Sequence, residues 1–136
     1  MLNEHITARI IATAMKIHSA LGPGLLESAY RECMSSQLIK SGFAVEKEKH
    51  LPVVFDGLKL EHAYRMDLLV EQKVVVELKT VTVLTPVDFQ QVLTYLRLGN
   101  FNTGLLINFQ VTSLRYGIRR ISNGPPKDSK SDSAQG

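Results

Sequence analysis

The chain has 136 residues, of which 44% are hydrophobic and 21% charged, and its formal net charge is +3. This size and composition predict one globular domain and exclude a chain that is disordered throughout, a collagen-like repeat and a coiled coil. No apolar run approaches the ~20 residues of a membrane span, no signal peptide is expected, and the single cysteine, Cys33, favours a reducing cytoplasm. A pI near 9.1 permits a nucleic-acid partner without requiring one.

Two helices are predicted at the start of the chain, over about residues 3–20 and 24–41. In both segments apolar side chains recur at helical spacing, and Gly22-Pro23-Gly24 interrupts the pattern between them. From Ala44 the apolar period becomes two. This change predicts an edge strand, which a turn at Asp56-Gly57 joins to a short strand at Leu58–Leu60.

The second half of the chain predicts further strands and one helix. The strands are rich in β-branched and apolar residues and are expected at Tyr64–Val70, Lys73–Val81, Thr103–Phe109 and Leu114–Ser122. Only Glu71-Gln72 separates the first two, so they should form an antiparallel hairpin. After this hairpin, Thr85-Pro86 predicts the start of a helix that runs to about Leu98 and stops at Gly99.

This order of elements predicts an α/β (α+β) fold in which helices flank a mixed central β-sheet. Two helices precede the sheet and one follows the central hairpin. Residues 1–122 are expected to form this single domain, and the polar tail, residues 123–136, is expected to be disordered.

The predicted hairpin carries a row of charged side chains on one face. If the hairpin is centred on Gln72, the numbers of opposite residues sum to 144, so Asp67 faces Glu77 and Arg65 faces Lys79. Two opposed carboxylates repel each other unless a cation lies between them. Mg²⁺ is typically held by one or two carboxylates together with phosphate oxygens and water. Lys79 would then lie beside the metal, where an ammonium can orient water or stabilise charge on a phosphate.

A solvated patch of ion pairs is the alternative interpretation of this row, and such pairs contribute about 0–1 kcal/mol each. The flanking sequences Val74-Val75-Val76 and Leu68-Leu69-Val70 favour the metal site, because they are typical of strands covered on both faces. Charged side chains within such strands are costly to bury without a partner.

Two other segments could contribute to the same site. Gln91 and Tyr95 are one turn apart on the helix after the hairpin, and they could reach a metal-bound water or a phosphate. The alternative is a half-buried tyrosine with a polar neighbour. Glu27, at the start of the second helix, could approach Asp67 and Glu77 as a third carboxylate, or could only complement the helix dipole.

These residues resemble a known superfamily. Asp67, Glu77-Leu78-Lys79 and Gln91-x-x-x-Tyr95 look like the motifs of the PD-(D/E)xK nucleases, including the RecB-like branch. Gly24-x-x-Glu27-x-x-Tyr30 resembles the signature of the small GxxExxY proteins assigned to that superfamily. Two further blocks of that group are similar to residues 64–67 and 104–109, so the resemblance spans about residues 5–122.

The resemblance implies an α/β nuclease that uses Mg²⁺ or Mn²⁺ to cut phosphodiester bonds of nucleic acid, with DNA favoured over RNA. Asp67, Glu77 and Glu27 would be the metal ligands. Lys79 would be the catalytic lysine, and Gln91 with Tyr95 would position substrate or water. Met66 stands where the motif has a nominal proline, a replacement that is frequent in the superfamily.

The sequence leaves two other functions open. A nuclease fold used only to bind nucleic acid or a protein partner would fit the modest charge, and its DNA binding would be salt-sensitive but indifferent to metal. A metal-free RNA-cleaving enzyme would need an acid–base set, of which only His62 and Tyr64 are recognisable. A homodimer that cuts both strands is a further hypothesis about partners.

Overall fold

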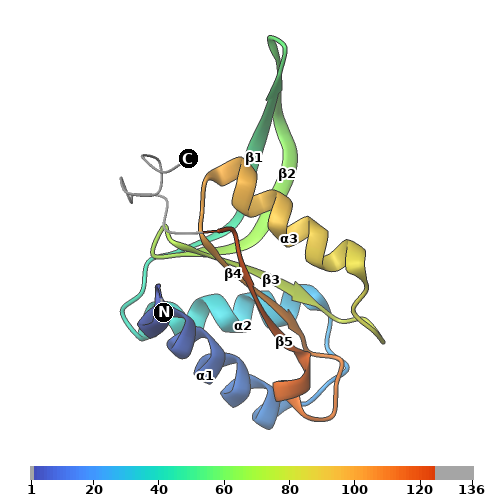
Figure 1. Ribbon diagram of the computed structural model, residues 1–136. Coiled ribbons are helices and arrows are strands. Elements are labelled where there is room, and N and C mark those ends of the chain that lie inside the picture. The colour runs from blue at the N-terminus through green and yellow to red at the C-terminus, as the bar shows by residue number, and fades with distance from the viewer. Residues whose placement is uncertain (1, 125–136) are drawn as a thin grey trace.

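The structure, a computed structural model, describes residues 2–124 of the chain (Figure 1). No helix in this range is long and apolar enough to cross a membrane. In chain order the elements are α1 (Glu4–Leu21), α2 (Glu27–Lys40), β1 (Val45–Phe55), β2 (Leu58–Val70), β3 (Val74–Lys79), α3 (Pro86–Gly99), β4 (Thr103–Asn108), the 3₁₀-helix η1 (Leu114–Gly117) and β5 (Ile118–Ser122).

The strands form one mixed sheet in the order β1-β2-β3-β4-β5. β3 and β4 are parallel, and the other neighbours are antiparallel. A parallel pair needs a crossover connection, and α3 supplies it between β3 and β4. The architecture is therefore the mixed α/β sheet that the sequence predicts, with two N-terminal helices and one helix after the hairpin.

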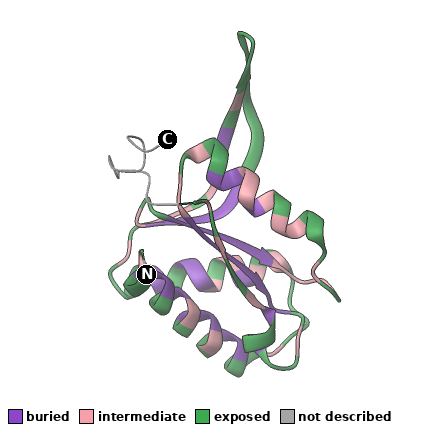
Figure 2. Cartoon of the chain, in the orientation of Figure 1, coloured by how far each residue is buried: buried purple, intermediate pink, exposed green. Residues whose placement is uncertain are grey.

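Helices cover both faces of the central strands (Figure 1). α1 and α2 pack on one face, where Ile10 and Met34 belong to the same cluster as Leu68. α3 packs on the opposite face, where Val92 meets Val75. Because both faces are covered, β4 and all of β3 except Lys79 are buried (Figure 2), and this explains their nearly continuous apolar sequence.

β1 and β2 continue beyond the rest of the sheet as a two-stranded arm (Figures 1 and 2). β2 pairs with β3 only from Leu68 to Val70, and residues 58–65 of its outer part are exposed. The arm ends at Asp56-Gly57, where both residues have positive φ, as tight hairpin turns require. β2 therefore leaves β3 beside Asp67, the residue next to the last paired position.

Several detailed predictions of local structure are confirmed. Partner numbers in the central hairpin do sum to 144, because Leu68, Leu69 and Val70 pair with Val76, Val75 and Val74. α3 begins at Pro86, and Thr85 and Asp88 form a capping box before it. One predicted helix start is wrong: α2 begins at Glu27 and not at Gly24, because the Gly24 φ of +108° is incompatible with a right-handed helix.

Two predicted strand boundaries are wrong. Leu58–Leu60 and Tyr64–Val70 are parts of one continuous strand, because β1 alone accompanies β2 along the arm. Leu114–Gly117 is a 3₁₀-helix, and β5 begins only at Ile118. The reason is that Leu114 is buried in the core cluster beside α1 instead of alternating along a strand. The predicted disordered tail lies outside the described residues from residue 125 onward.

Candidate active site

The residues predicted for the site line one cavity of about 610 Å³. The predicted residues among its walls are Glu27, Asp67, Glu77, Lys79, Gln91 and Tyr95. They come from α2, β2, β3 and α3, and the cavity lies where β2 separates from β3. The base of the arm supplies the remaining lining residues, which are His50, His62, Ala63, Tyr64 and Arg65.

The two predicted acidic ligands meet at the point where β2 and β3 separate. Asp67 and Glu77 are each only 5% exposed. Oδ2 of Asp67 accepts a hydrogen bond of 2.8 Å from the backbone N–H of Leu78, and Oε1 of Glu77 accepts one of 3.3 Å from the N–H of Asp67. The two carboxylates thus accept hydrogen bonds from backbone N–H groups beyond the last paired position of β2 and β3.

Burial disfavours the ionised form of both carboxyls. It raises the pKa of Glu77 to about 8, and the negative charge of Asp67 adds to this effect. Burial also raises the pKa of Asp67, although the Leu78 N–H and the Arg31 guanidinium act in the opposite direction. At neutral pH the two groups therefore retain a proton as a coupled pair, unless another cation offsets their charge.

Lys79 places its ammonium between the acids of the hairpin and α3. Nζ lies 3.8 Å from Oε2 of Glu77 and 3.9 Å from Oδ1 of Asp88. It also donates a hydrogen bond of 3.0 Å to Oε1 of Gln91. The predicted lysine and the predicted helix glutamine are thus in direct contact.

Tyr95 lies one turn after Gln91 and is 2% exposed. Its ring meets that of Tyr64 at 72°, with the ring centroids 6.1 Å apart. Burial, followed by the charges of Glu77 and Asp67, raises the pKa of Tyr95 well above its ordinary value. The phenol therefore stays protonated and can both donate and accept a hydrogen bond in the cavity.

Glu27 occupies the first position of α2 and faces the same cavity. Burial raises its pKa, and the charge of Asp67 raises it further. The Glu27 carboxyl therefore lies within the electrostatic field of the hairpin acids. The N-terminal end of a helix also favours a negative charge, so this position is consistent with both roles considered for Glu27.

Arg31 and Glu48 also belong to the site, although sequence reasoning missed them. On α2, Nη1 of Arg31 lies 3.6 Å from Oδ1 of Asp67, and its Nη2 lies 3.5 Å from Oε1 of Glu48. Glu48 in turn pairs with Arg65 at 3.1 Å. The predicted opposition of Arg65 and Lys79 is not observed, because β2 has left β3 before that position and Arg65 pairs with β1 instead.

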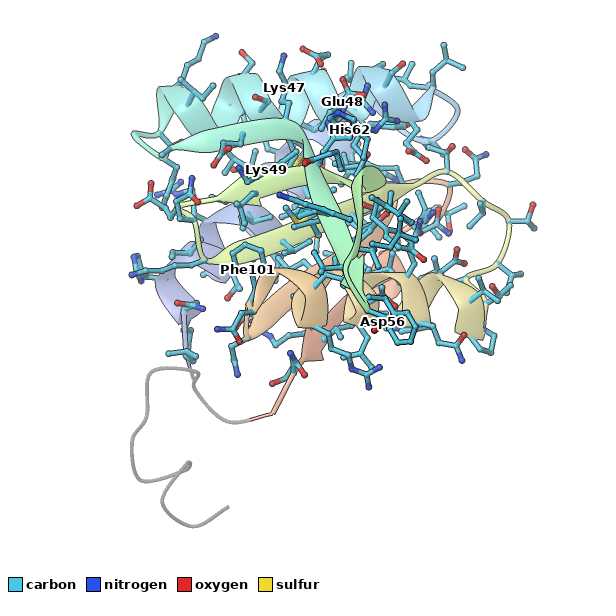
Figure 3. All side chains as sticks on the ribbon, turned by 90° about the horizontal axis from the view of Figure 1, so that it is seen from above. Lys47, Glu48, Lys49, Asp56, His62 and Phe101 are labelled. Carbon is cyan, nitrogen blue, oxygen red and sulfur yellow. The ribbon has the colours of Figure 1, made fainter. Side chains whose placement is uncertain are left out.

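Glu48 has an unusual backbone conformation for a residue inside a strand. Its φ is +51°, in the left-handed region that is costly for residues other than glycine. It stands across from Asp67, between the ladder pairs Lys47↔Leu68 and Lys49↔Met66. Figure 3, a view down onto the arm, labels Glu48 near α2 and Asp56 at the tip. Strained positions of this kind concentrate at functional sites.

Comparison with known proteins bears on the family and on the fold of this chain. A family model for the PD-(D/E)XK nuclease superfamily matches residues 4–121. The chain belongs to this superfamily. No curated protein matches it. Among solved structures it is similar to the crystal structure of SSO0001, with 18% identity and a TM-score of 0.54. The match covers 98% of this chain but 66% of that one, and at this identity the likeness shows the fold alone.

Nucleases of the PD-(D/E)XK superfamily are typically metal-dependent, and the donor atoms in this cavity suit a hard divalent cation. Asp67 and Glu77 offer carboxylate oxygens, which Mg²⁺ and Mn²⁺ prefer. Within residues 2–124, no group of three or more His, Cys, Asp or Glu side chains is arranged to hold a metal ion. The structure therefore does not assemble Glu27 with the other two acids as a three-carboxylate set. A pair of carboxylates, completed by water and phosphate oxygens, still meets the usual requirement of Mg²⁺.

Proposed function

We propose that this chain is a Mg²⁺- or Mn²⁺-dependent nuclease that hydrolyses phosphodiester bonds, with DNA favoured over RNA. The convergence of Asp67, Glu77 and Lys79 in one cavity is the observation that carries this proposal. Burying two neighbouring carboxyls is costly, and perturbed acids in a cavity are typical of functional sites. A divalent cation that binds between them would offset the cost.

Each residue has a role that follows from its position. Asp67 and Glu77 would ligate the metal, which when bound supplies Lewis-acid activation of water and phosphate. Lys79 would orient the attacking water or stabilise negative charge on the phosphate. Gln91 holds the Lys79 ammonium by a hydrogen bond of 3.0 Å. Tyr95 would present its hydroxyl to substrate or water, and Glu27 would assist from the cavity wall at the start of α2 without completing a three-carboxylate set.

We also infer that the chain belongs to the small GxxExxY group within the superfamily. The three residues of the signature shape the start of α2 in different ways. Gly24 has a φ of +108°, which favours glycine, and Glu27 lines the cavity. The Tyr30 hydroxyl donates to the carbonyl of Gly22 at 2.5 Å and accepts from the N–H of Leu25 at 3.2 Å. The signature thereby holds the segment that carries Glu27.

Cleavage assays test the proposed function. Purified protein would be incubated in Mg²⁺ or Mn²⁺ with plasmid, linear duplex and single-stranded DNA, and with RNA of the same sequence. We expect DNA cleavage that EDTA abolishes, and a loss of at least about 100-fold in Asp67→Asn and Glu77→Gln. Asp56→Asn, an acid at the arm tip outside the cavity, is the matched control and should cut at the wild-type rate. Cleavage that persists in both cavity variants would overturn the proposal.

A nucleic-acid-binding module without catalysis is the second candidate. It is favoured by the finding that, among residues 2–124, no three His, Cys, Asp or Glu side chains are arranged to hold a metal ion. Calorimetric titration with Mn²⁺ separates the two candidates. Binding that is lost in Asp67→Asn supports the nuclease, because the carboxylate is needed as a ligand. DNA binding that is sensitive to salt but indifferent to metal supports the module.

A further inference from the structure

The base of the arm adds side chains to the cavity that the proposed metal chemistry does not use. His50 on β1 and His62 on β2 both line the cavity, together with Arg65. The two imidazole rings have centroids 4.5 Å apart and meet at 74° (His62 is labelled in Figure 3). The cavity that holds the acids thus has a second wall of nitrogen donors.

This second wall lies on the arm, whereas Asp67 and Glu77 lie at its foot, where β2 and β3 separate. His50 is the ladder partner of Arg65. Arg65 is two residues from Asp67 on the same strand, which corresponds to about 7 Å. One strand of a duplex carries a phosphate about every 3.4 Å along the helix axis. A strand held at Asp67 would therefore bring a phosphate one or two nucleotides away to the second wall.

The chemistry of these side chains suits a phosphate. Guanidinium and imidazole N–H groups donate hydrogen bonds to phosphate oxygens, and such contacts fix the register of a nucleic-acid strand. The Arg65 side chain is 53% exposed. Its ion pair joins Nη1 to Glu48, and a guanidinium has further N–H donors that can contact a ligand.

We propose that His50, His62 and Arg65 form a phosphate-binding subsite, which holds a backbone phosphate near the scissile one and directs the substrate strand along the arm. The identity of the ligand as a nucleic-acid strand rests on the proposed function. The subsite does not include Asp67 or Glu77. It therefore controls the affinity for the nucleic-acid strand rather than the rate of phosphodiester hydrolysis.

Histidine NMR tests the subsite directly, with inorganic phosphate as the probe. Protein labelled with ¹⁵N at histidine would be titrated with phosphate in EDTA. We expect the ring signals of His50 and His62 to shift on one shared saturable curve. His5, exposed on α1, and His18, whose Nε2 lies 2.8 Å from the Val111 carbonyl oxygen, serve as internal controls. Equal shifts of all four rings, or no shift at His50 and His62, would overturn the proposal.

DNA binding measured by fluorescence anisotropy in EDTA provides the second test. We expect Arg65→Met to lower the slope of log K against log salt by about 1. The double variant His50→Gln/His62→Gln should weaken binding about tenfold at low salt. Lys59→Met removes an exposed cation of the same arm, outside the cavity and paired with Glu61, and should change neither quantity. An equal loss in Lys59→Met would reveal a general charge effect and refute the subsite.

The two proposals fail in different ways. Because both binding tests are made in EDTA, they do not depend on metal-dependent cleavage. Binding through His50, His62 and Arg65 without any cleavage would refute the nuclease and retain the subsite. Normal cleavage and normal affinity after replacement of all three side chains would refute the subsite alone.

Discussion

Asp67 and Glu77 are equally buried, but a different cation offsets the negative charge of each. Arg31 approaches Asp67 from α2 at 3.6 Å, and Lys79 approaches Glu77 from β3 at 3.8 Å. Both distances exceed those of a direct charge-assisted hydrogen bond, which are about 2.7–2.9 Å. The two cations therefore offset the negative charge only in part. The carboxylate oxygens keep the capacity to bind a further cation.

The raised pKa of Glu77 makes a prediction about stability. Burial and the charge of Asp67 raise this pKa from 4.5 to about 8, so between these values the folded protein binds more protons than the unfolded chain. Stability from this group is present in full below pH 4.5 and is lost as the pH rises toward 8. Glu77→Gln should remove that loss, so in EDTA at pH 8 it should unfold at higher urea concentration than the wild type.

The control for this measurement is Glu61→Gln, an exposed carboxyl on the arm. It should keep the wild-type dependence of the free energy of unfolding on pH. If Glu77→Gln also kept that dependence, the Glu77 carboxyl would have an ordinary pKa in the folded protein.

Two substitutions at Glu48 separate its charge from its backbone strain. Glu48→Gln and Glu48→Gly both remove the carboxylate that contacts Arg31, so both should slow cleavage about tenfold by loosening the partner of Asp67. Glycine also relieves the φ of +51°. Glu48→Gly should therefore be more stable than Glu48→Gln by about 1 kcal/mol in urea unfolding. Equal stability of the two variants would show that the left-handed conformation stores no strain.

At the scale of elements, α3 connects the hydrophobic core to the cavity. Val92 and Leu96 are buried against the sheet, while Asp88 and Gln91 contact Lys79 on the side of the cavity. Asp88 and Gln91 are three residues apart, and Val92 and Leu96 are four apart, so each pair shares one side of the helix and the two sides adjoin. The capping box at the start of α3 therefore supports both the packing of the helix and the position of its polar side chains.

Two cap substitutions should have different consequences. Thr85→Ala removes one half of the capping box and should lower the free energy of unfolding by about 1 kcal/mol while changing the cleavage rate little. Asp88→Ala removes the other half and also the carboxylate 3.9 Å from Lys79. It should therefore lower both the free energy of unfolding and the cleavage rate. Urea unfolding and cleavage at saturating DNA measure the two effects. A slower rate in Thr85→Ala alone would contradict this division of roles.

At the scale of the whole molecule, the domain consists of a body with a two-sided core and an arm that packs against little else. Large apolar side chains are exposed on the outer part of the arm, including Phe55 at 77% and Leu58 at 60%. A two-stranded ribbon by itself is marginally stable in water. The arm is therefore expected to open more readily than the body while its base still forms a wall of the cavity.

Hydrogen exchange should reveal this difference in stability. Backbone amides of residues 53–60 should exchange much faster than those of β3 and β4, because ribbon opening requires no disruption of the core. Addition of a DNA oligonucleotide in EDTA should slow exchange around His50 and Arg65 if the strand follows the arm. Protection of the outer arm equal to that of β3 would show that arm and body unfold together.

The sequence predicted the helices, the central hairpin register and six candidate site residues, which the structure brings to one cavity. The helices and the hairpin register depend on short-range interactions, whereas the six residues were selected also by their resemblance to the superfamily motifs. The two-residue apolar period and the turn at Glu71-Gln72 set the register that ends at Leu68 and Val76, which brings the Asp67 N–H within hydrogen-bond reach of Glu77. Thr85-Pro86 defines the start of α3. Gln91 and Tyr95 are recognisable because one helical turn places them together.

Only the tertiary structure decided where β2 stops following β3, and this point controls the rest of the site. Because the strands separate beside Asp67, Arg65 pairs with Glu48 instead of facing Lys79. The two histidines line the cavity, and Arg31 and Glu48 extend the ion pairs around Asp67, through contacts between segments far apart in the sequence. No local period encodes such contacts, since they depend on the order of the strands and on the packing of α2 against them.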